Sequence, residues 1–452
     1  MFILYCYYEE VLEIVILSLF ILLVYVIYIL FSLKVYKFII NPVSLYSTLW
    51  MVFAFLACQG IWDLYYPSLE AILYILISTA VFTFTSFLTY AKFRKNSSDF
   101  KKVDSSNLLS KNRFVLLIVL NILSIVCVMP FLLQTAPLLI NGEWALVRTY
   151  YLNANTMGII FNTHKSLMLQ WIIFPTFYVT TIISAVLVAK RKPSLLLIFI
   201  STVGILMIVF TTAGRSPLLK CLTFYLLAFL INSKNIKNIL RKIKQSNLAI
   251  KILLICGVIA LLFISSQRSL SEDTSPLQNA FYYFTAPIVY FSYIVENPEQ
   301  FALDKDYLFG KATLGFISTP IEIIYSILLK HDYVGADTII TGYVSQYINF
   351  SPSIKGNAVS TSLYPFIKDF GKLGVVIGPL IYAFLVNYVY AKFDKNIFWN
   401  CLSIYMLYTV FFSEWQYELL FPQAFSMIFF LYILVGIKSI PFKKNKKVEF
   451  LG

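Results

Sequence analysis

Long apolar segments separated by polar stretches recur along almost the whole chain. Each has roughly the 20 residues that a helix needs to cross the hydrocarbon core of a bilayer. Lipid offers no partner to an open sheet edge, and the alternating ten-residue pattern of a barrel is absent, so the segments predict membrane-spanning helices. We count eleven predicted spans, and those that begin at Pro217 and Ile397 are the shortest: Val11–Leu33, Val43–Trp62, Leu69–Tyr90, Phe114–Leu133, Leu167–Ala189, Ser194–Ala213, Pro217–Asn232, Leu248–Ser265, Leu373–Tyr390, Ile397–Ser413 and Leu419–Ile437.

The overall composition points to the same class of protein. Of the 452 residues, 59% are hydrophobic and 13% are charged, whereas about a quarter of a soluble domain is charged. This balance excludes a cytosolic globular enzyme and a disordered chain. We therefore predict an all-α, polytopic integral membrane protein. The first ten residues hold two acids and no base, so we expect the first span to be retained as an anchor and not cleaved as a signal peptide.

Basic residues gather in six polar stretches, and eleven spans would place all six on one side of the membrane. The stretches contain Lys34 and Lys37, residues 92–113, residues 190–192, residues 234–251, Lys392 and Lys395, and residues 438–447. The positive-inside rule makes that side the cytoplasm, with the N-terminus outside and the C-terminus inside. The formal net charge of +14 then reflects topology and contact with anionic lipid, and it gives no reason to expect nucleic acid binding.

This topology divides the chain into three parts. Residues 1–266 hold eight spans and a small external loop at 134–166, and residues 371–452 hold the last three spans and a basic tail. Between them, residues 267–370 form a large external loop, whose apolar stretches are too short or too polar for spans and predict interfacial or re-entrant helices. A loop of this length is seldom a mere connector, so we expect the chemistry on the external face.

Arg215 is the sharpest candidate for that chemistry. It follows Gly214 and precedes Pro217 between two predicted spans, which places it near an external helix N-terminus. Helix dipole and guanidinium would act together on an anion there, with Lys220 about one turn deeper. The alternative is an arginine that reaches lipid headgroups. Because the positive-inside rule disfavours arginine on this side, we prefer the anion site.

Two further arginines, Arg148 and Arg268, are predicted to be external. Together with Arg215 they predict a site for a phosphorylated ligand, because guanidinium groups match the geometry of phosphate oxygens. The alternative is three separate contacts with headgroups.

Acidic residues of the external face have less specific interpretations. Asp369 suits either the N-cap of the following span or a general base. Asp304 and Asp306 match a DxD pattern, which is common in solvated loops, and we expect no metal there. Glu414 and Glu418, beside the last external turn, are interpreted as solvated carboxylates. The sequence contains no P-loop, GxSxG, HExxH or dinucleotide-binding fingerprint, and no metal or cofactor is predicted.

Several short motifs resemble those of a known family in their order along the chain. They are Asn41-Pro42-Val43-Ser44, Gly214-Arg215-Ser216, Arg268, and Asn357…Thr361 followed by Asp369-Phe370-Gly371…Gly374. On these residues the sequence resembles the Wzy-type oligosaccharide repeat unit polymerases of bacteria, which make O-antigen and capsular polysaccharide. The family is similar to the many-helix glycosyltransferases of the GT-C class.

The resemblance implies a metal-independent glycosyltransferase of the bacterial cytoplasmic (inner) membrane. Its substrate would be an undecaprenyl-pyrophosphate-linked oligosaccharide, and lipid pyrophosphate would leave as a hydroxyl of the incoming unit attacks the reducing-end sugar. Membrane lipids, a chain-length regulator and a flippase are candidate partners. The implied catalytic residues are Asp369, Arg215 and Arg268, and the implied substrate-binding residues are Arg148, Arg215, Arg268, Lys220, Asn357 and Thr361.

Three other functions fit parts of the pattern. A flippase for the same lipid would predict charges buried in the membrane and internal symmetry, and neither is evident. An O-antigen ligase would use a histidine of the external loop, for which His331 is the candidate. A non-enzymatic scaffold gives no reason for the external arginines.

Overall fold

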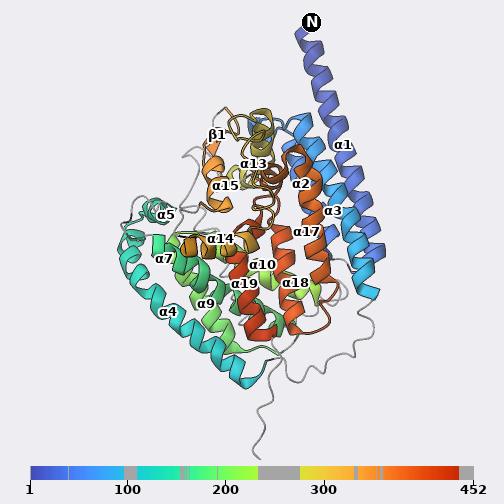
Figure 1. Cartoon of the computed structure of the whole chain (residues 1–452). Coiled ribbons are helices and arrows are strands. Elements are labelled where there is room, and N and C mark those ends of the chain that lie inside the picture. Colours follow the sequence, from blue (N-terminus) through green and yellow to red (C-terminus); the bar gives the residue numbers. More distant parts are fainter. Residues whose placement is uncertain are drawn as a thin grey trace, which may run out of the picture.

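The computed structural model describes residues 2–38, 40–95, 109–152, 158, 160–161, 163–190, 192–232, 275–329, 334–352, 354–356 and 360–436. Helices make up most of this part of the chain (Figure 1). Those of the N-terminal half are α1 (Phe2–Tyr36), α2 (Pro42–Ala57), η1 (Ile61–Asp63), α3 (Leu69–Lys95), α4 (Lys111–Ile140), α5 (Trp144–Leu152), α7 (Thr163–Met168), η3 (Leu169–Ile173), α8 (Phe174–Ala189), α9 (Leu195–Thr212) and α10 (Ser216–Ile231).

The C-terminal half adds shorter helices and one small antiparallel ladder. These elements are α13 (Pro276–Glu296), α14 (Gly315–Leu329), α15 (Ala336–Val344), β1 (Ile348–Asn349), β2 (Lys355–Gly356), α16 (Leu363–Phe370), η4 (Gly371–Leu373), α17 (Gly374–Tyr390), α18 (Ile397–Phe411), η5 (Glu418–Leu420), α19 (Gln423–Leu431) and η6 (Tyr432–Gly436). The predicted all-α class is confirmed.

Ten of the eleven predicted spans coincide with helices, and the eighth, Leu248–Ser265, lies outside the described residues. Within the described part, 6 helical stretches are long and apolar enough to cross a membrane. Four shorter apolar helices are Pro42–Ala57, Ser216–Ile231, Ile397–Phe411 and Gln423–Gly436. The chain is therefore an all-α membrane protein.

Helices distant in sequence pack side by side along their lengths. In Figure 1, α17 lies beside α3, which in turn lies beside α1. Asn387 of α17 joins all three, since its Oδ1 accepts from Tyr36 Oη at 2.7 Å and its Nδ2 donates to Ser86 Oγ at 2.6 Å. In α4, Asn121 Nδ2 donates to Thr180 Oγ1 of α8 at 2.7 Å. Such buried polar contacts help membrane helices to associate, because the hydrophobic effect does not drive helix association in lipid.

Basic residues from separate loops meet at one end of the bundle. Arg94, at the end of α3, forms an ion pair of 3.1 Å with Asp394 between α17 and α18. Lys190 interacts electrostatically with the same carboxylate, and the Lys392 ammonium lies 6.0 Å from the Phe93 ring. Three of the six predicted basic groups therefore share one end, as eleven spans require. Which membrane face this end occupies stays a prediction.

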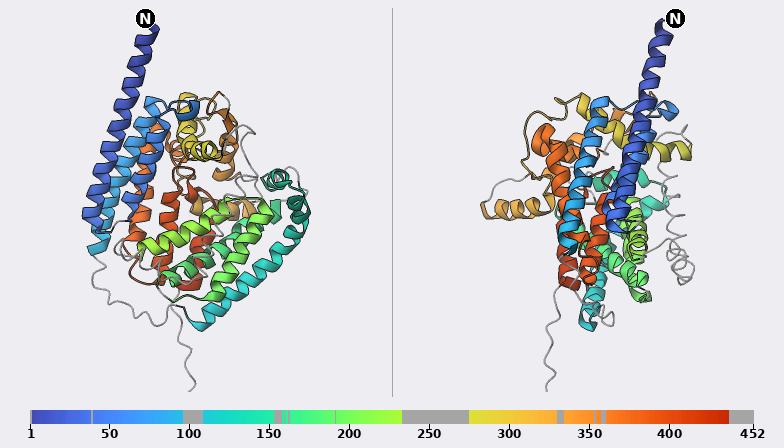
Figure 2. Two further views of the ribbon diagram at one scale, coloured as in Figure 1. Left: turned by 180° about the vertical axis from the view of Figure 1, so that it is seen from behind. Right: turned by 90° about the vertical axis from the view of Figure 1, so that its right-hand side faces the viewer.

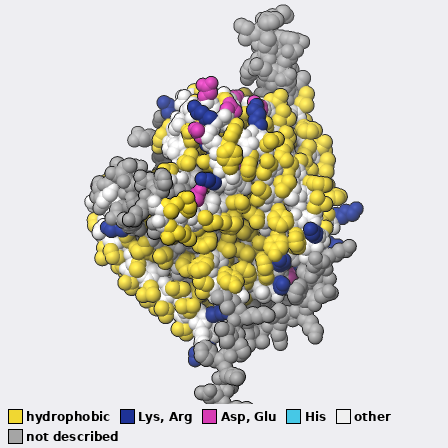
Figure 3. Space-filling view, in the orientation of Figure 1, with side chains coloured by type: hydrophobic (Ala, Val, Ile, Leu, Met, Phe, Trp, Pro, Cys, Tyr) yellow, Lys and Arg dark blue, Asp and Glu magenta, His cyan; other side chains and the backbone are white. Residues whose placement is uncertain are grey.

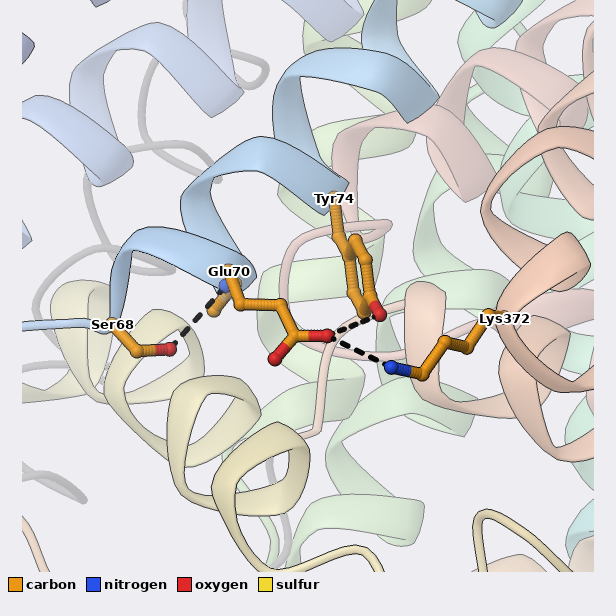
Figure 4. A network of polar contacts seen from close by, with 5 residues as sticks. Ser68, Glu70, Tyr74 and Lys372 are labelled. Atoms are coloured by element: carbon orange, nitrogen blue, oxygen red, sulfur yellow. Dashed lines mark hydrogen bonds and ion pairs between the residues drawn. The ribbon is translucent and has the colours of Figure 1, made fainter.

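The opposite end carries an outer layer of short elements. There, α13, α15 and β1 lie at the end toward which the N-terminus of α1 points (Figure 1). The loop after α2 joins this layer, because Tyr65 N donates to Phe350 O at 2.9 Å and Ser68 N donates to Ser292 Oγ at 2.7 Å. Close by, Glu70 at the start of α3 contacts both Tyr74 and Lys372 (Figure 4). The outer layer is thus attached to the bundle at several points.

Two adjacent residues of α16 provide the tightest attachment. Lys368 Nζ donates to Ala302 O at 2.7 Å and to Lys305 O at 2.9 Å. Asp369 accepts from the backbone amides of Ala312 at 3.0 Å and Thr313 at 2.5 Å. Both side chains are fully buried. They fix the segment that leads into α14.

Helix α14 projects sideways from the molecule, roughly across the direction of the long helices (Figure 2). One face of α14 is apolar and exposed, with Ile321 59%, Ile324 59% and Leu328 74% accessible. On the molecular face of Figure 3, hydrophobic side chains cover the region of the long helices, and acidic side chains gather over the outer layer. An apolar belt of this kind marks a surface that lipid covers.

Candidate anion-binding site

Arg215 lies in the tight turn that joins α9 to α10. Ala213 ends α9 in the left-handed conformation, with φ 46°, and Arg215 occupies the N-cap position of α10. Pro217 follows in the first turn, where its missing N–H leaves no hydrogen bond unmade. The guanidinium is therefore held next to a helix N-terminus, as the sequence predicts.

The structure brings Arg148 and Arg215 together. A Cβ added to Gly214 would lie 3.4 Å from Arg148 Nη1, so the turn and the guanidinium of Arg148 are in close contact. Arg215 stacks over the Tyr283 ring at 4.6 Å from its centroid, and Tyr283 also interacts electrostatically with Arg148. On its other side Arg148 lies 5.5 Å from the Tyr151 ring. Helices α5, α10 and α13 thus place two guanidiniums around one aromatic side chain.

The electrostatics of this arginine pair favour an anionic ligand. Burial lowers the pKa of the Arg148 guanidinium, and the positive charge of Arg215 adds to that effect. Among the described residues, Arg148 makes no ion pair, and its buried Nε has no hydrogen-bond partner. The two guanidiniums repel each other, and an anion between them would be attracted to both. A diphosphate has the charge and the oxygens to do so.

The remaining predicted ligands of this site divide into two groups. Arg268, Asn357 and His331 lie outside the described residues, so their predicted roles stay predictions. Thr361 is fully buried, with φ 57°, and its Oγ1 accepts from Leu363 N at 3.2 Å. The described contact of its side chain is thus with the start of α16 and not with the arginines.

Lys220, one turn deeper along α10, is engaged in an ion pair. Its Nζ lies 3.2 Å from Glu418 Oε2, and both side chains are largely buried, with 12% and 5% accessible. The Lys220 ammonium also lies over the rings of Tyr178 at 5.7 Å and Tyr408 at 5.5 Å. Gln416 Nε2 donates to the other carboxylate oxygen of Glu418 at 2.6 Å. The interpretation of Glu418 as a solvated carboxylate is wrong, because helices α8, α10 and α18 enclose it.

Buried tyrosines connect this ion pair to the arginines. Tyr178 interacts electrostatically with both Glu418 and Tyr151, and Tyr151 contacts Arg148. From the other direction, Trp415 Nε1 donates to Tyr283 O at 3.0 Å. The turn at residues 412–420 therefore reaches the arginine pair at Trp415 and the lysine at Glu418. We call Arg148, Arg215, Tyr283, Lys220 and Glu418 the charged cluster.

Asp369 has a structural position that the sequence did not reveal. It lies near the end of α16, and the N-cap of α17 is Leu373, so the N-cap interpretation is wrong. Its two carboxylate oxygens accept the amides of Ala312 and Thr313 from the outer layer. The carboxylate is thus occupied as a tether, and its predicted role as general base stays a prediction.

Glu414, on the same turn as Glu418, is also interpreted from the sequence as a solvated carboxylate. It is fully buried, and among the described residues neither of its oxygens has a hydrogen-bond partner. Burial raises the pKa of Glu414 well above the usual value of a carboxyl group. The interpretation of a solvated group is therefore wrong, because charge on this side chain would be neither hydrated nor paired.

Three described residues of the other family-like motifs, Asn41, Ser44 and Gly374, have architectural roles. Asn41 caps α2 in a reciprocal arrangement with Ser44, since each side chain accepts the backbone amide of the other at 2.9 and 3.1 Å. Gly374 allows α17 to approach α16, because an added Cβ would lie 2.1 Å from Phe366 O. Among the motif residues that the structure describes, Arg215 is thus the one whose side chain enters the charged cluster.

Fold, apolar surface and charged cluster together define a polytopic helical membrane protein with a candidate anion-binding site at its outer-layer end. No protein-family model, curated protein or solved structure matches the chain.

Proposed function

We propose that the protein is a polysaccharide polymerase of the bacterial cytoplasmic membrane. In this proposal it has eleven spans and a GT-C-like architecture, and it joins polyprenyl-pyrophosphate-linked oligosaccharide repeat units on the external face. The observation that carries the proposal is the convergence of Arg148 and Arg215 on Tyr283 beside a helix N-terminus. The resemblance of the motif order supports the choice of substrate.

The reaction requires negative charge to be stabilised where the lipid diphosphate leaves. As the bond from the sugar to the phosphate breaks, that bond's electron pair stays with the diphosphate. Guanidiniums fixed in advance stabilise this charge in the transition state without having to reorganise. Burial of the Arg148 guanidinium also strengthens its attraction for the departing anion. The Tyr283 ring beside it is partly exposed and offers a flat surface for a sugar ring.

The test is an exchange of the chromosomal gene for an Arg215→Ala variant, followed by analysis of surface polymer and lipid-linked glycans. We expect long polymer to disappear while single capped repeats and membrane insertion persist, since losing one charge-stabilising donor costs about 10²–10³ in turnover. We expect the same loss of long polymer in Arg148→Ala. Arg94→Ala is the matched control, because Arg94 pairs with Asp394 at the other end of the bundle.

Two outcomes would contradict the proposal. Normal polymer length in Arg215→Ala would remove the arginine from the mechanism. If lipid-linked repeats in the variant stay on the cytoplasmic face, the defect is in crossing and the flippase alternative holds.

A further inference from the structure

We propose that Glu418 receives the proton of the attacking hydroxyl group, an inference that rests on the proposed function. Its carboxylate is fixed by Lys220 Nζ at 3.2 Å on one oxygen and by Gln416 Nε2 at 2.6 Å on the other. Each carboxylate oxygen has two acceptor positions, so both retain one after these contacts. The side chain is buried, with 5% accessibility, and the proposal places the attacking hydroxyl group at this accessible part.

The arginines and Glu418 are placed to contact the two ends of a transfer reaction, which are the leaving diphosphate and the attacking hydroxyl group. Lys220 lies five residues after Arg215 along α10, which at a rise of about 1.5 Å per residue is about 7–8 Å along the helix axis. Tyr151 lies beside Arg148, and Tyr178 interacts electrostatically with both Tyr151 and Glu418. A sugar bound beside this part of α10 would have its diphosphate toward the arginines and the attacking hydroxyl group toward Glu418.

The step balances with the groups already named. The acceptor oxygen forms a bond to the anomeric carbon of the donor sugar while the bond from that carbon to the diphosphate oxygen breaks. Its electron pair leaves with the lipid diphosphate, where Arg148 and Arg215 hold it. The acceptor proton moves to the free position on the Glu418 carboxylate. Lys220 pairs with that carboxylate at 3.2 Å and serves as a positioning residue.

The other two buried carboxylates of this end are less suited to the step. Asp369 accepts two backbone amides of the segment that it tethers, at 3.0 and 2.5 Å, and any movement would break the attachment of the outer layer. Glu414 has no cation or donor among the described residues to hold it ionised, and burial raises its pKa. Glu418 combines a stabilising cation, a fixed orientation and a link to the arginines.

The experiment compares purified variants in lipid vesicles supplied with native lipid-linked repeat units. Donor-site binding is measured separately with farnesyl diphosphate, a short polyprenyl diphosphate. For Glu418→Gln we expect farnesyl diphosphate affinity within about threefold of wild type and chain joining slower by about 10²–10⁴. The matched control is Asp394→Asn, which also removes a carboxylate from an ion pair but at the opposite end, and it should join units normally.

A double variant separates proton transfer from a merely structural ion pair. Removing one partner of a buried pair leaves the other charge uncompensated and destabilises the protein. Lys220→Met combined with Glu418→Gln removes both charges, so we expect thermal stability to recover while chain joining stays as slow as in Glu418→Gln. Recovery of joining in the double variant, or normal joining in Glu418→Gln, would overturn the assignment of Glu418. Failure of the wild-type protein to join units would instead refute the proposed function.

Discussion

Glu414 shows how strongly a single side chain can respond to its surroundings. Three residues after α18 ends, its carboxyl group is enclosed with no described partner, whereas Glu418 on the same turn has a lysine and an amide. The two residues are four positions apart and identical in chemistry. Burial raises the pKa of Glu414 and favours its neutral state, whereas Glu418 has an ion-pair partner.

The neutral state of Glu414 predicts a pH dependence of stability. A carboxyl group whose pKa is raised in the folded state stabilises the protein fully below the unfolded-state pKa, and this stability is lost as pH rises toward the folded-state value. In Glu414→Gln the side chain at this position carries no charge at any pH. Its stability advantage over wild type should grow by about 1.4 kcal/mol per pH unit above about pH 4.3 until the folded-state pKa is reached.

Melting temperatures of both proteins in detergent, measured between pH 5 and pH 8, check this prediction. Glu143→Gln, at an exposed position of the turn between α4 and α5, is the control and should follow wild type. Parallel curves for Glu414→Gln and wild type would mean that Glu414 is ionised when folded.

Asp369→Asn tests whether that carboxylate acts in structure or in chemistry. The amide keeps one acceptor oxygen but places a donor group opposite a backbone N–H, so we expect a loss of about 2 kcal/mol in stability. Turnover per folded molecule should stay near wild type. The control is Asp304→Asn, which changes an exposed residue near the tethered segment. Full thermal stability together with lost turnover would restore the general-base hypothesis.

At the residue scale, the sequence revealed cations better than carboxylates. Arg215 stands out because Gly214 and Pro217 mark a turn next to a helix start, and arginine is disfavoured on the external side. Nothing local distinguishes Glu414, Glu418 and Asp369, since each is a single acid next to an aromatic residue. Glu418 has its partner on α10, Asp369 has its partners in the Ala312–Thr313 segment, and Glu414 has none among the described residues. These partners are distant in sequence, so only the three-dimensional fold reveals them.

At the scale of elements, close backbone approach between α16 and α17 depends on one residue. The two helices fold back on each other at Gly371, whose φ of 60° favours glycine. Gly374 then faces the backbone of Phe366, and that backbone cannot move aside as a flexible side chain could.

Gly374→Ala should therefore separate α16 from α17 and cost about 1–3 kcal/mol of stability. Thermal unfolding in detergent measures the loss. Gly342→Ala in α15 is the matched control, because an added Cβ there meets nothing within 4 Å, and a helical Gly→Ala change without a clash gains up to about 1 kcal/mol. Equal behaviour of the two variants would show that the α16–α17 contact tolerates a wider spacing.

The elements themselves were largely predictable because the length and apolar content of a segment decide whether it forms a helix in lipid. Their ends were less predictable. Polar capping groups set some of them, such as Asn41 at the start of α2 and Asn396 at the start of α18. The outer layer was predicted only as interfacial helices, since its order and tethers depend on contacts between distant segments such as α13 and the loop after α2.

At the scale of the whole molecule, the distribution of charge predicts orientation. The end that carries Arg94, Lys190 and Lys392 should face the cytoplasm, and the charged cluster should face outward. Single cysteines at Glu143 and Lys192, in a background with the 6 native cysteines replaced, can report this.

A membrane-impermeant maleimide applied to intact spheroplasts should label Glu143→Cys strongly and should label Lys192→Cys only after permeabilisation. Both positions are exposed and lie at opposite ends of helices that cross the bundle. Labelling in the reverse pattern would place the arginine pair in the cytosol and remove its lipid diphosphate substrate.

The adjacent Lys368 and Asp369 also restrict how the molecule can admit a large substrate. Their four side-chain hydrogen bonds are joined by two between main chains, from Leu308 N to Lys368 O and from Phe309 N to Asp369 O. These hydrogen bonds fix residues 302–313 to α16. The stretch therefore cannot move away as a lid unless buried hydrogen bonds break. A bulky glycolipid must enter by a route that leaves these hydrogen bonds intact. Any wider opening for it would have to come from movement of neighbouring parts of the outer layer.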